Sequence, residues 1–150
     1  MMQQDVQEFV SMFFDRLEAG IKEHPLRRLI DNFYTGKTAN LFSCHDCKQT
    51  KKVEENFYSL TLEVKSAKNL AESFGRFILG ELISDYKCDF CGKKADVSKR
   101  TRISQAPQNL ILHLKRIDFN MDTFINEKIT NKHEFPTAFN LYPYSLDYYQ

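Results

Sequence analysis

Regular spacing of apolar residues first appears between Gln4 and Glu18. Apolar side chains recur there every three or four positions, at Val6, Phe9, Val10, Phe13, Phe14 and Leu17. This spacing is typical of an amphipathic helix, because such positions share one face of a 3.6-residue repeat. Asp5 and Glu8 fall in the first turn, where carboxylates complement the helix dipole. Gly20 and Pro25 then supply stop signals, so the pattern predicts a helix that ends near residue 20.

The next segments alternate between helical and strand-like patterns. Pro25–Tyr34 predicts a short second helix, and Thr38–Ser43 predicts a strand that leads into the first cysteine pair. Tyr58–Val64 alternates apolar and polar residues with a period of two, which indicates a half-buried strand. Asp96–Ser104 repeats that alternation. Between these strands, Ser66-Ala67-Lys68-Asn69 offers capping residues for a helix that carries Leu70, Phe74, Phe77, Ile78 and Leu82.

The last third of the chain reads as further strands. Asn109–Ile117 is an almost continuous apolar run, which favours a central strand buried on both faces. We expect a turn over Asp118–Asp122, another strand over Phe124–Ile129 and a strand end at Glu134–Pro136. Because the helices gather toward the N-terminus and do not alternate with the strands, the pattern predicts an α+β fold.

The four cysteines form two CxxC pairs, Cys44 with Cys47 and Cys88 with Cys91. This spacing favours a structural Zn²⁺ site in which four thiolates close a tetrahedron. The segment between the pairs is longer than the ~15–20 residues of a compact zinc ribbon, so it should carry structure of its own. Two disulfides and a thioredoxin-like redox pair are the alternatives; no signal peptide supports the former, and no strand-to-helix setting supports the latter. His45 is expected to be a turn residue.

Composition limits the classes of partner. The 150 residues carry a net charge of +1, and no apolar run is long enough to cross a membrane. We therefore expect a soluble protein of the cytoplasm or nucleus, with neither a membrane nor a nucleic acid as its partner. The segment from Lys87 to Arg102 has a net charge of +4, and Lys99, Arg100 and Arg102 give it a basic face. A zinc-ribbon protein that binds nucleic acid therefore remains a distant alternative.

Several motifs, in this order, resemble the ubiquitin-specific protease family. They are Gln3-Gln4-Asp5-Val6-Gln7-Glu8-Phe9, the two CxxC pairs, Pro107–Arg116, and Asn126–Ile129 followed by Glu134-Phe135-Pro136. The resemblance implies a partial papain-like fold with thumb helices, zinc-ribbon fingers and an antiparallel palm sheet. It places the end of the thumb at residues 1–35, the fingers at 36–105 and an incomplete palm at 106–150.

The family resemblance also implies a partner, ubiquitin and ubiquitinated proteins, and a binding site. Gln4, Asp5 and Glu8 would line the channel for ubiquitin's extended, arginine-containing tail, where carboxylates can pair with guanidinium groups. Ile117 stands where the family usually has an aromatic residue, and Phe119 could replace that residue's packing against the tail.

The segments that resemble the family do not include its catalytic residues. Catalysis in the family needs a nucleophilic cysteine activated by a histidine. All four cysteines belong to the metal pairs, and we assign no catalytic role to any of the four histidines. His113 is expected to be a hydrogen-bonded core residue, whereas His24, His45 and His133 are expected at the surface or in loops. The chain therefore reads as the middle portion of a deubiquitinase that is inactive by itself. The alternative is a noncatalytic ubiquitin-binding module.

Overall fold

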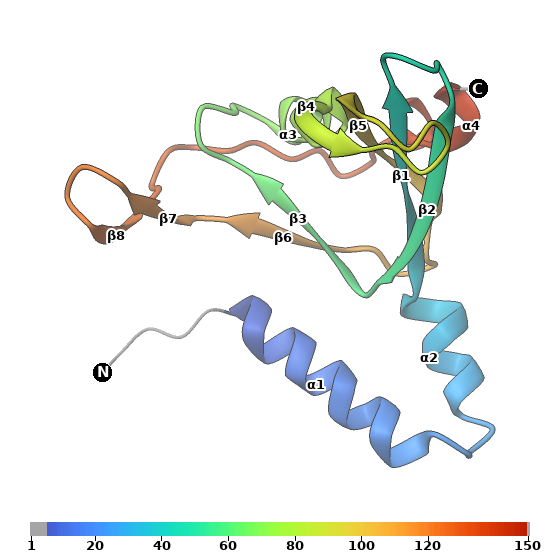
Figure 1. Ribbon diagram of the computed structural model, residues 1–150. Helices are drawn as coiled ribbons and strands as arrows, with labels where there is room; N and C mark the ends of the chain where they lie inside the picture. Colours follow the sequence, from blue (N-terminus) through green and yellow to red (C-terminus); the bar gives the residue numbers. More distant parts are fainter. Residues whose placement is uncertain (1–5, 150) are drawn as a thin grey trace.

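The structure is a computed structural model that describes residues 6–149. Its first two elements are an antiparallel pair of helices, α1 (Val6–Ile21) and α2 (Arg27–Tyr34) (Figure 1). Both predicted helices are confirmed, although α1 continues through Gly20 to Ile21. Arg27 joins the two helices, because its guanidinium lies 2.7 Å from the carboxylate of Glu18.

A four-stranded antiparallel sheet follows, in the order β2-β1-β5-β4. Its strands are β1 (Gly36–Cys44), β2 (Thr50–Phe57), β4 (Glu81–Lys87) and β5 (Lys94–Gln105). The central strands β1 and β5 correspond to predicted strands. The edge strands β2 and β4 were not predicted, because most of their side chains are exposed and so lack an apolar alternation.

A second, smaller layer pairs β3 (Ser59–Glu63) with β6 (Ile111–Lys115). The alternation predicted for β3 is confirmed, since Leu60 and Leu62 are buried and their neighbours are more exposed. The two strands run parallel, which differs from the antiparallel palm expected from the family. The connection between them passes through α3 (Leu70–Leu79), β4 and β5 and is long enough to return the chain to the same end of the pair.

Two expectations about neighbouring segments were wrong. β6 has β3 as its only strand partner among residues 6–149 and is half-buried at every position, so it is not a central strand. Helix α3 (Leu70–Leu79) is capped by Asn69 as predicted, but it stops before Leu82, which lies in β4. Gly80 ends the helix at φ 85°, where a Cβ would lie 2.9 Å from the carbonyl oxygen of Lys99.

The chain after β6 forms a hairpin of β7 (Ile117–Asn120) and β8 (Ile125–Lys128). The turn predicted over Asp118–Asp122 therefore begins later. The side chain of Asn120 nucleates it by accepting hydrogen bonds from the backbone amides of Asp122 at 2.8 Å and Thr123 at 3.3 Å. The chain ends with a short 3₁₀ turn, η1 (Tyr142–Tyr144), and α4 (Leu146–Tyr149).

The main core lies where α3 covers the β3–β6 pair. Phe74 and Leu62 are completely buried there. The C-terminal segment closes this core, because Phe139 stacks on Phe74 at 5.2 Å and Tyr144 lies 4.9 Å from the same ring. The α+β fold class is thus confirmed.

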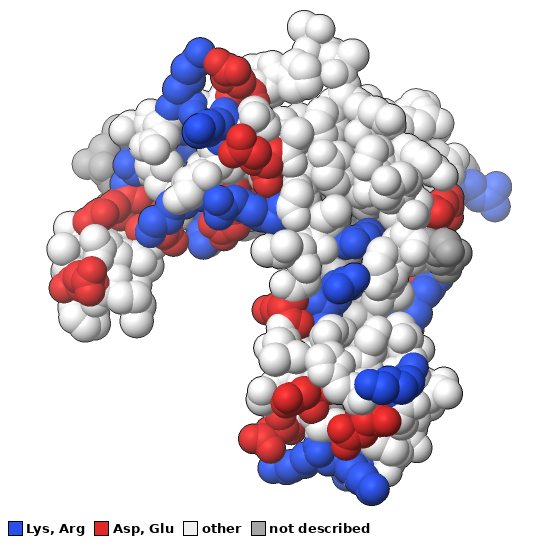
Figure 2. Space-filling view, turned by 90° about the horizontal axis from the view of Figure 1, so that it is seen from above, with Lys and Arg blue, Asp and Glu red and all other residues white. Residues whose placement is uncertain are grey.

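Seen from above, the molecule has a hollowed outline with two arms (Figure 2). By comparison with Figure 1, one arm lies on the side of the β7–β8 hairpin and the other on the side of the four-stranded sheet. Positive and negative side chains are interspersed on both arms in this view. Within residues 6–149, no helix combines the length and the apolar character needed to cross a bilayer.

Candidate functional site: a cysteine cluster and a groove

The structure brings the four predicted ligand cysteines together at the tips of two hairpin-like turns. Their Sγ atoms all lie within 4.8 Å of one another, and those of Cys47 and Cys88 are 3.7 Å apart. Cys44 and Cys88 are buried, while Cys47 and Cys91 are half-buried. A tetrahedral site with metal–sulfur bonds of about 2.3 Å has edges of about 3.8 Å, so this cluster could hold a metal ion.

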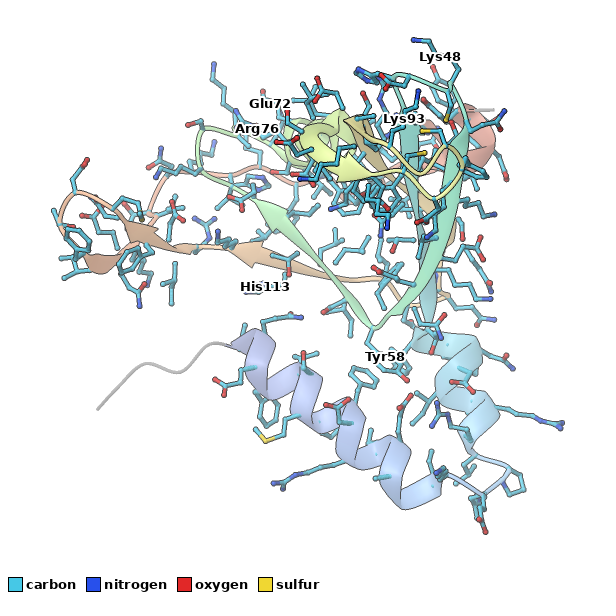
Figure 3. The ribbon with its side chains drawn as sticks, in the orientation of Figure 1. Lys48, Tyr58, Glu72, Arg76, Lys93 and His113 are labelled. Carbon is cyan, nitrogen blue, oxygen red and sulfur yellow. The ribbon has the colours of Figure 1, made fainter. Side chains whose placement is uncertain are left out.

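The two cysteine turns have the same backbone structure. The amide of Lys48 donates to the carbonyl of Cys44 at 3.1 Å, and the amide of Gly92 donates to that of Cys88 at 2.9 Å. Lys48 and Gly92 both adopt a left-handed backbone conformation, with φ of 60° and 71°. In Figure 3, Lys48 and Lys93 mark these turns beside the sulfur atoms. The CxxC spacing alone therefore specifies two equivalent sulfur-presenting turns.

The turns are also joined to each other and to the sheet by polar contacts. Lys51 Nζ lies 2.6 Å from the carboxylate of Asp89. This ion pair links β2, which follows the Cys44–Cys47 turn, to the Cys88–Cys91 turn. His45 Nε2 lies 2.6 Å from Ser98 Oγ. His45 is exposed and is not part of the cluster, as expected.

Two of the thiols, Cys47 and Cys88, differ in their surroundings and therefore in pKa. Backbone amides of Cys91 and Phe90 donate to the sulfur of Cys88 and lower the pKa of its thiol to about 7. The backbone amide of Gln49 lowers the pKa of Cys47, but burial and the other three thiols together raise it to about 11. Four thiolates cannot share this space without a cation, because each negative charge opposes the next ionisation.

A groove of about 460 Å³ separates α1 from the β6–β7 segment. Helix α1 contributes Val6, Gln7 and Val10, and the opposite wall is formed by residues 111–117 with Lys128. His113 lies on the side of β6 that faces α1 in Figure 3. The groove therefore runs along one strand and one helix, a shape suited to an extended peptide.

Two contacts hold α1 at this distance from the sheet. Gln7 Nε2 donates to Ser59 Oγ at 2.7 Å. The ring of Phe14 stacks on that of Tyr58, with centroids 4.4 Å apart and planes 6° apart. Both partners lie at or just before the start of β3, so β3 sets the position of the helix and the width of the groove.

The predicted tail-binding residues stand in different positions relative to this groove. Gln4 and Asp5 lie outside the described residues. Glu8 is exposed on α1, and Phe119 on β7 is 47% exposed. Their role remains a prediction. Ile117, which the sequence analysis compared with an aromatic residue of the family that packs against the tail, lines the groove. Sequence reasoning did not single out Gln7 and Lys128 as lining residues, because their proximity depends on how the helix and the hairpin meet.

The histidine assignments need a correction. His113 is half-buried, with Thr61 Oγ1 3.4 Å from its Nδ1, so it is not a core residue. His133 is the buried one at 8% exposure, and its Nε2 lies 2.9 Å from Ser73 Oγ. It is buried because Glu134 forms a backbone bridge with Asn69, which draws a polar segment onto the core.

Lys99, Arg100 and Arg102 were expected to form a basic face on β5, but they do not form a single exposed surface. Arg102 is only 8% exposed and stacks on the ring of Tyr149, with its guanidinium carbon 4.6 Å from the centroid. The guanidinium of Arg100 donates a hydrogen bond to the hydroxyl of the same tyrosine, and Lys99 forms a salt bridge with Glu81 at 2.8 Å. These side chains are thus largely engaged within the protein.

Comparisons with known proteins agree on one family. The family model described as ubiquitin carboxyl-terminal hydrolase matches residues 1–149. Ubiquitin carboxyl-terminal hydrolase 47 of Drosophila melanogaster is 32% identical over 148 residues, covering 93% of this chain and 10% of the relative. Ubiquitin carboxyl-terminal hydrolase 24 of Mus musculus is 30% identical, covering 96% of this chain and 6% of the relative.

Solved structures agree with this result. A chain of the SAGA Ubp8/Sgf11/Sus1/Sgf73 DUB module bound to ubiquitin aldehyde is 26% identical with a TM-score of 0.81, over 95% of this chain and 33% of that chain. A second structure of a SAGA DUB module, bound to monoubiquitin, gives a TM-score of 0.82 at 26% identity over 96% of this chain and 34% of that one. This chain thus spans about a third of the solved chains and a tenth or less of these curated relatives.

Proposed function

Since this chain belongs to the ubiquitin carboxyl-terminal hydrolase family, we propose that it forms the ubiquitin-holding part of a thiol-dependent deubiquitinase. The observation that carries the proposal is the groove between α1 and β6, in a fold similar to DUB modules bound to ubiquitin aldehyde and to monoubiquitin. Ubiquitin and ubiquitinated proteins are the partners that this function requires.

The parts of the chain divide between the body and the tail of ubiquitin. Residues 1–35 are the end of the thumb, 36–105 the fingers and 106–150 a part of the palm. The hollow between the two arms in Figure 2 receives the globular body. The groove receives the extended tail, whose arginines pair with Glu8 and with Asp5 and Gln4, which precede α1 in the sequence. Phe119 packs against the tail.

The cluster of Cys44, Cys47, Cys88 and Cys91 holds Zn²⁺ in this proposal. The support is the donor set, because four thiolates with tetrahedral spacing suit Zn²⁺ better than the hard cations Mg²⁺ and Ca²⁺. Four protein ligands leave no open position, so the ion is structural. When bound, it neutralises the thiolates and fixes the two turns against each other.

Catalysis needs a nucleophile that these residues do not provide. The chain has four cysteines and all of them lie in the metal cluster. We therefore expect the 150-residue chain to show no hydrolysis of a fluorogenic ubiquitin conjugate. Turnover that persists after each cysteine has been replaced in turn would contradict this assignment.

Ubiquitin binding tests the positive part of the proposal. The zinc-loaded chain should bind ubiquitin in a titration calorimeter, and Glu8→Gln should weaken the affinity about two- to fivefold through loss of a partly exposed charge pair. Glu23→Gln is the matched control, because Glu23 is an exposed glutamate beyond the end of α1. A folded, zinc-loaded chain with no measurable affinity would refute the proposal.

A further inference from the structure

A cluster of four charged residues lies where β3, β6 and β7 meet. It consists of Glu63, Lys65, Lys115 and Asp118, here called the hairpin cluster. Lys65 Nζ lies 2.8 Å from Asp118 Oδ2, and Lys115 Nζ lies 3.5 Å from Asp118 Oδ1. Lys115 also pairs with Glu63 at 3.2 Å. Each carboxylate oxygen of Asp118 thus contacts a lysine from a different part of the β3–β6 layer.

Asp118 is one of the few hairpin side chains with such anchoring. Its side chain is 24% exposed, whereas every residue of β8 is exposed. Asp118 is ionised at neutral pH, because Lys65 and Lys115 lower the pKa of its carboxyl group. At the base of the hairpin, Arg116 donates to the carbonyls of Ile129 at 3.2 Å and Asn131 at 3.1 Å. These contacts hold the base of the hairpin.

The geometry of a strand connects this anchor to the groove. Successive side chains of a strand leave on opposite faces, and residues two apart share a face. Ile117 lines the groove, so Phe119 lies on the same face of β7 and Asp118 on the other. Holding Asp118 against the two lysines therefore fixes the face on which Phe119 is presented.

We propose that Asp118 is a positioning residue: the hairpin cluster orients the β7–β8 hairpin so that Phe119 meets the tail of ubiquitin at the groove. The inference rests on the proposed function for the identity of the ligand. The anchoring itself can be tested without ubiquitin.

The first experiment measures hydrogen exchange of the hairpin amides, residues 117–128, in the complete chain. Asp118→Asn keeps the shape of the side chain and removes its charge. We expect exchange in the hairpin to rise about three- to fivefold, since two partly exposed ion pairs are lost, while the β3–β6 amides stay unchanged. Asp118→Glu should restore most of the protection. Glu134→Gln is the control, because it removes one carboxylate from the exposed Lys132–Glu134 pair outside the hairpin.

The second experiment compares the affinities of intact ubiquitin and of ubiquitin that lacks its C-terminal tail. Asp118→Asn should weaken binding of intact ubiquitin about threefold and leave the tailless form unchanged, which a general loss of structure would not do. Unchanged hairpin exchange overturns the anchor, and equal weakening of both forms overturns the positioning role. If the wild-type chain binds neither form, the proposed function fails, and the exchange result still decides whether Asp118 anchors the hairpin.

Discussion

At the residue scale, the buried Ser73–His133 pair can be assigned completely from its hydrogen bonds. The single hydroxyl proton of Ser73 is donated to the carbonyl of Glu63 at 2.7 Å. The contact at 2.9 Å to His133 Nε2 must then be donated by the imidazole, so His133 is the Nε2–H tautomer. Its Nδ1 is buried without a partner. The serine is therefore the only described polar partner of this side chain.

This pair makes Ser73 more important to stability than an ordinary serine. Ser73→Ala removes one hydroxyl and leaves the buried Nε2–H of His133 without its serine partner, so it should lower the free energy of unfolding by about 1–3 kcal/mol. Urea denaturation of the metal-loaded chain measures the change. Ser11→Ala, at an exposed position of α1, should shift the value by less than about 0.5 kcal/mol. Equal effects of the two substitutions would mean that the pair does not stabilise the fold.

At the scale of elements, α1 depends on very few contacts with the rest of the chain. Phe14 is the only buried residue of the helix in the described structure, and it packs on Tyr58 and on Tyr34. Much of the apolar stripe remains exposed, with Phe9 at 62% and Phe13 at 47%. One side of the groove is thus held mainly by one aromatic contact and the Gln7–Ser59 hydrogen bond.

Because of this, Phe14→Ala should release α1 without unfolding the sheet. Truncation of a buried phenylalanine costs about 3–5 kcal/mol, more than the Gln7–Ser59 bond can offset. Hydrogen exchange should show lost protection over residues 6–21 and unchanged protection in β1 and β5. Phe9→Ala removes an exposed ring from the same helix and should leave α1 protected. Loss of protection throughout the sheet in Phe14→Ala would show that the helix is not an independent unit.

At the scale of the whole molecule, a metal ion bound by the four-cysteine cluster would fix one arm. The strands β2 and β4 bury few side chains, and the cluster joins the ends of both hairpins at the tip of the sheet. The binding free energy of a structural zinc site, of order 10 kcal/mol, acts as folding free energy for the segment that it closes.

Cys88→Ser should therefore release the metal and loosen the sheet. Elemental analysis of freshly purified, reduced protein should find one zinc per wild-type chain and much less in the variant, together with faster exchange in β2 and β4. Ser98→Ala is the control, because it removes the contact to His45 and no thiol. Reduced wild-type protein without zinc would contradict the metal assignment.

The sequence by itself determined the elements whose apolar pattern or turn chemistry is local. It placed α1, α2, β1, β3, the N-terminus of α3 and the two CxxC turns, because helix periodicity, strand alternation and cysteine spacing are all encoded within short segments. The four-cysteine cluster followed from spacing, and the family from the order of the motifs.

Only the tertiary structure decided which surfaces these elements share. The edge strands β2 and β4 form because pairing with β1 and β5 satisfies their backbones, although their side chains carry no apolar signal. Burial of His133, half-exposure of β6 and the pairing of Asp118 with Lys65 all depend on contacts between residues far apart in the chain. Local patterns fix backbone conformation, whereas the groove and its charges arise when separate segments pack, which no single segment encodes.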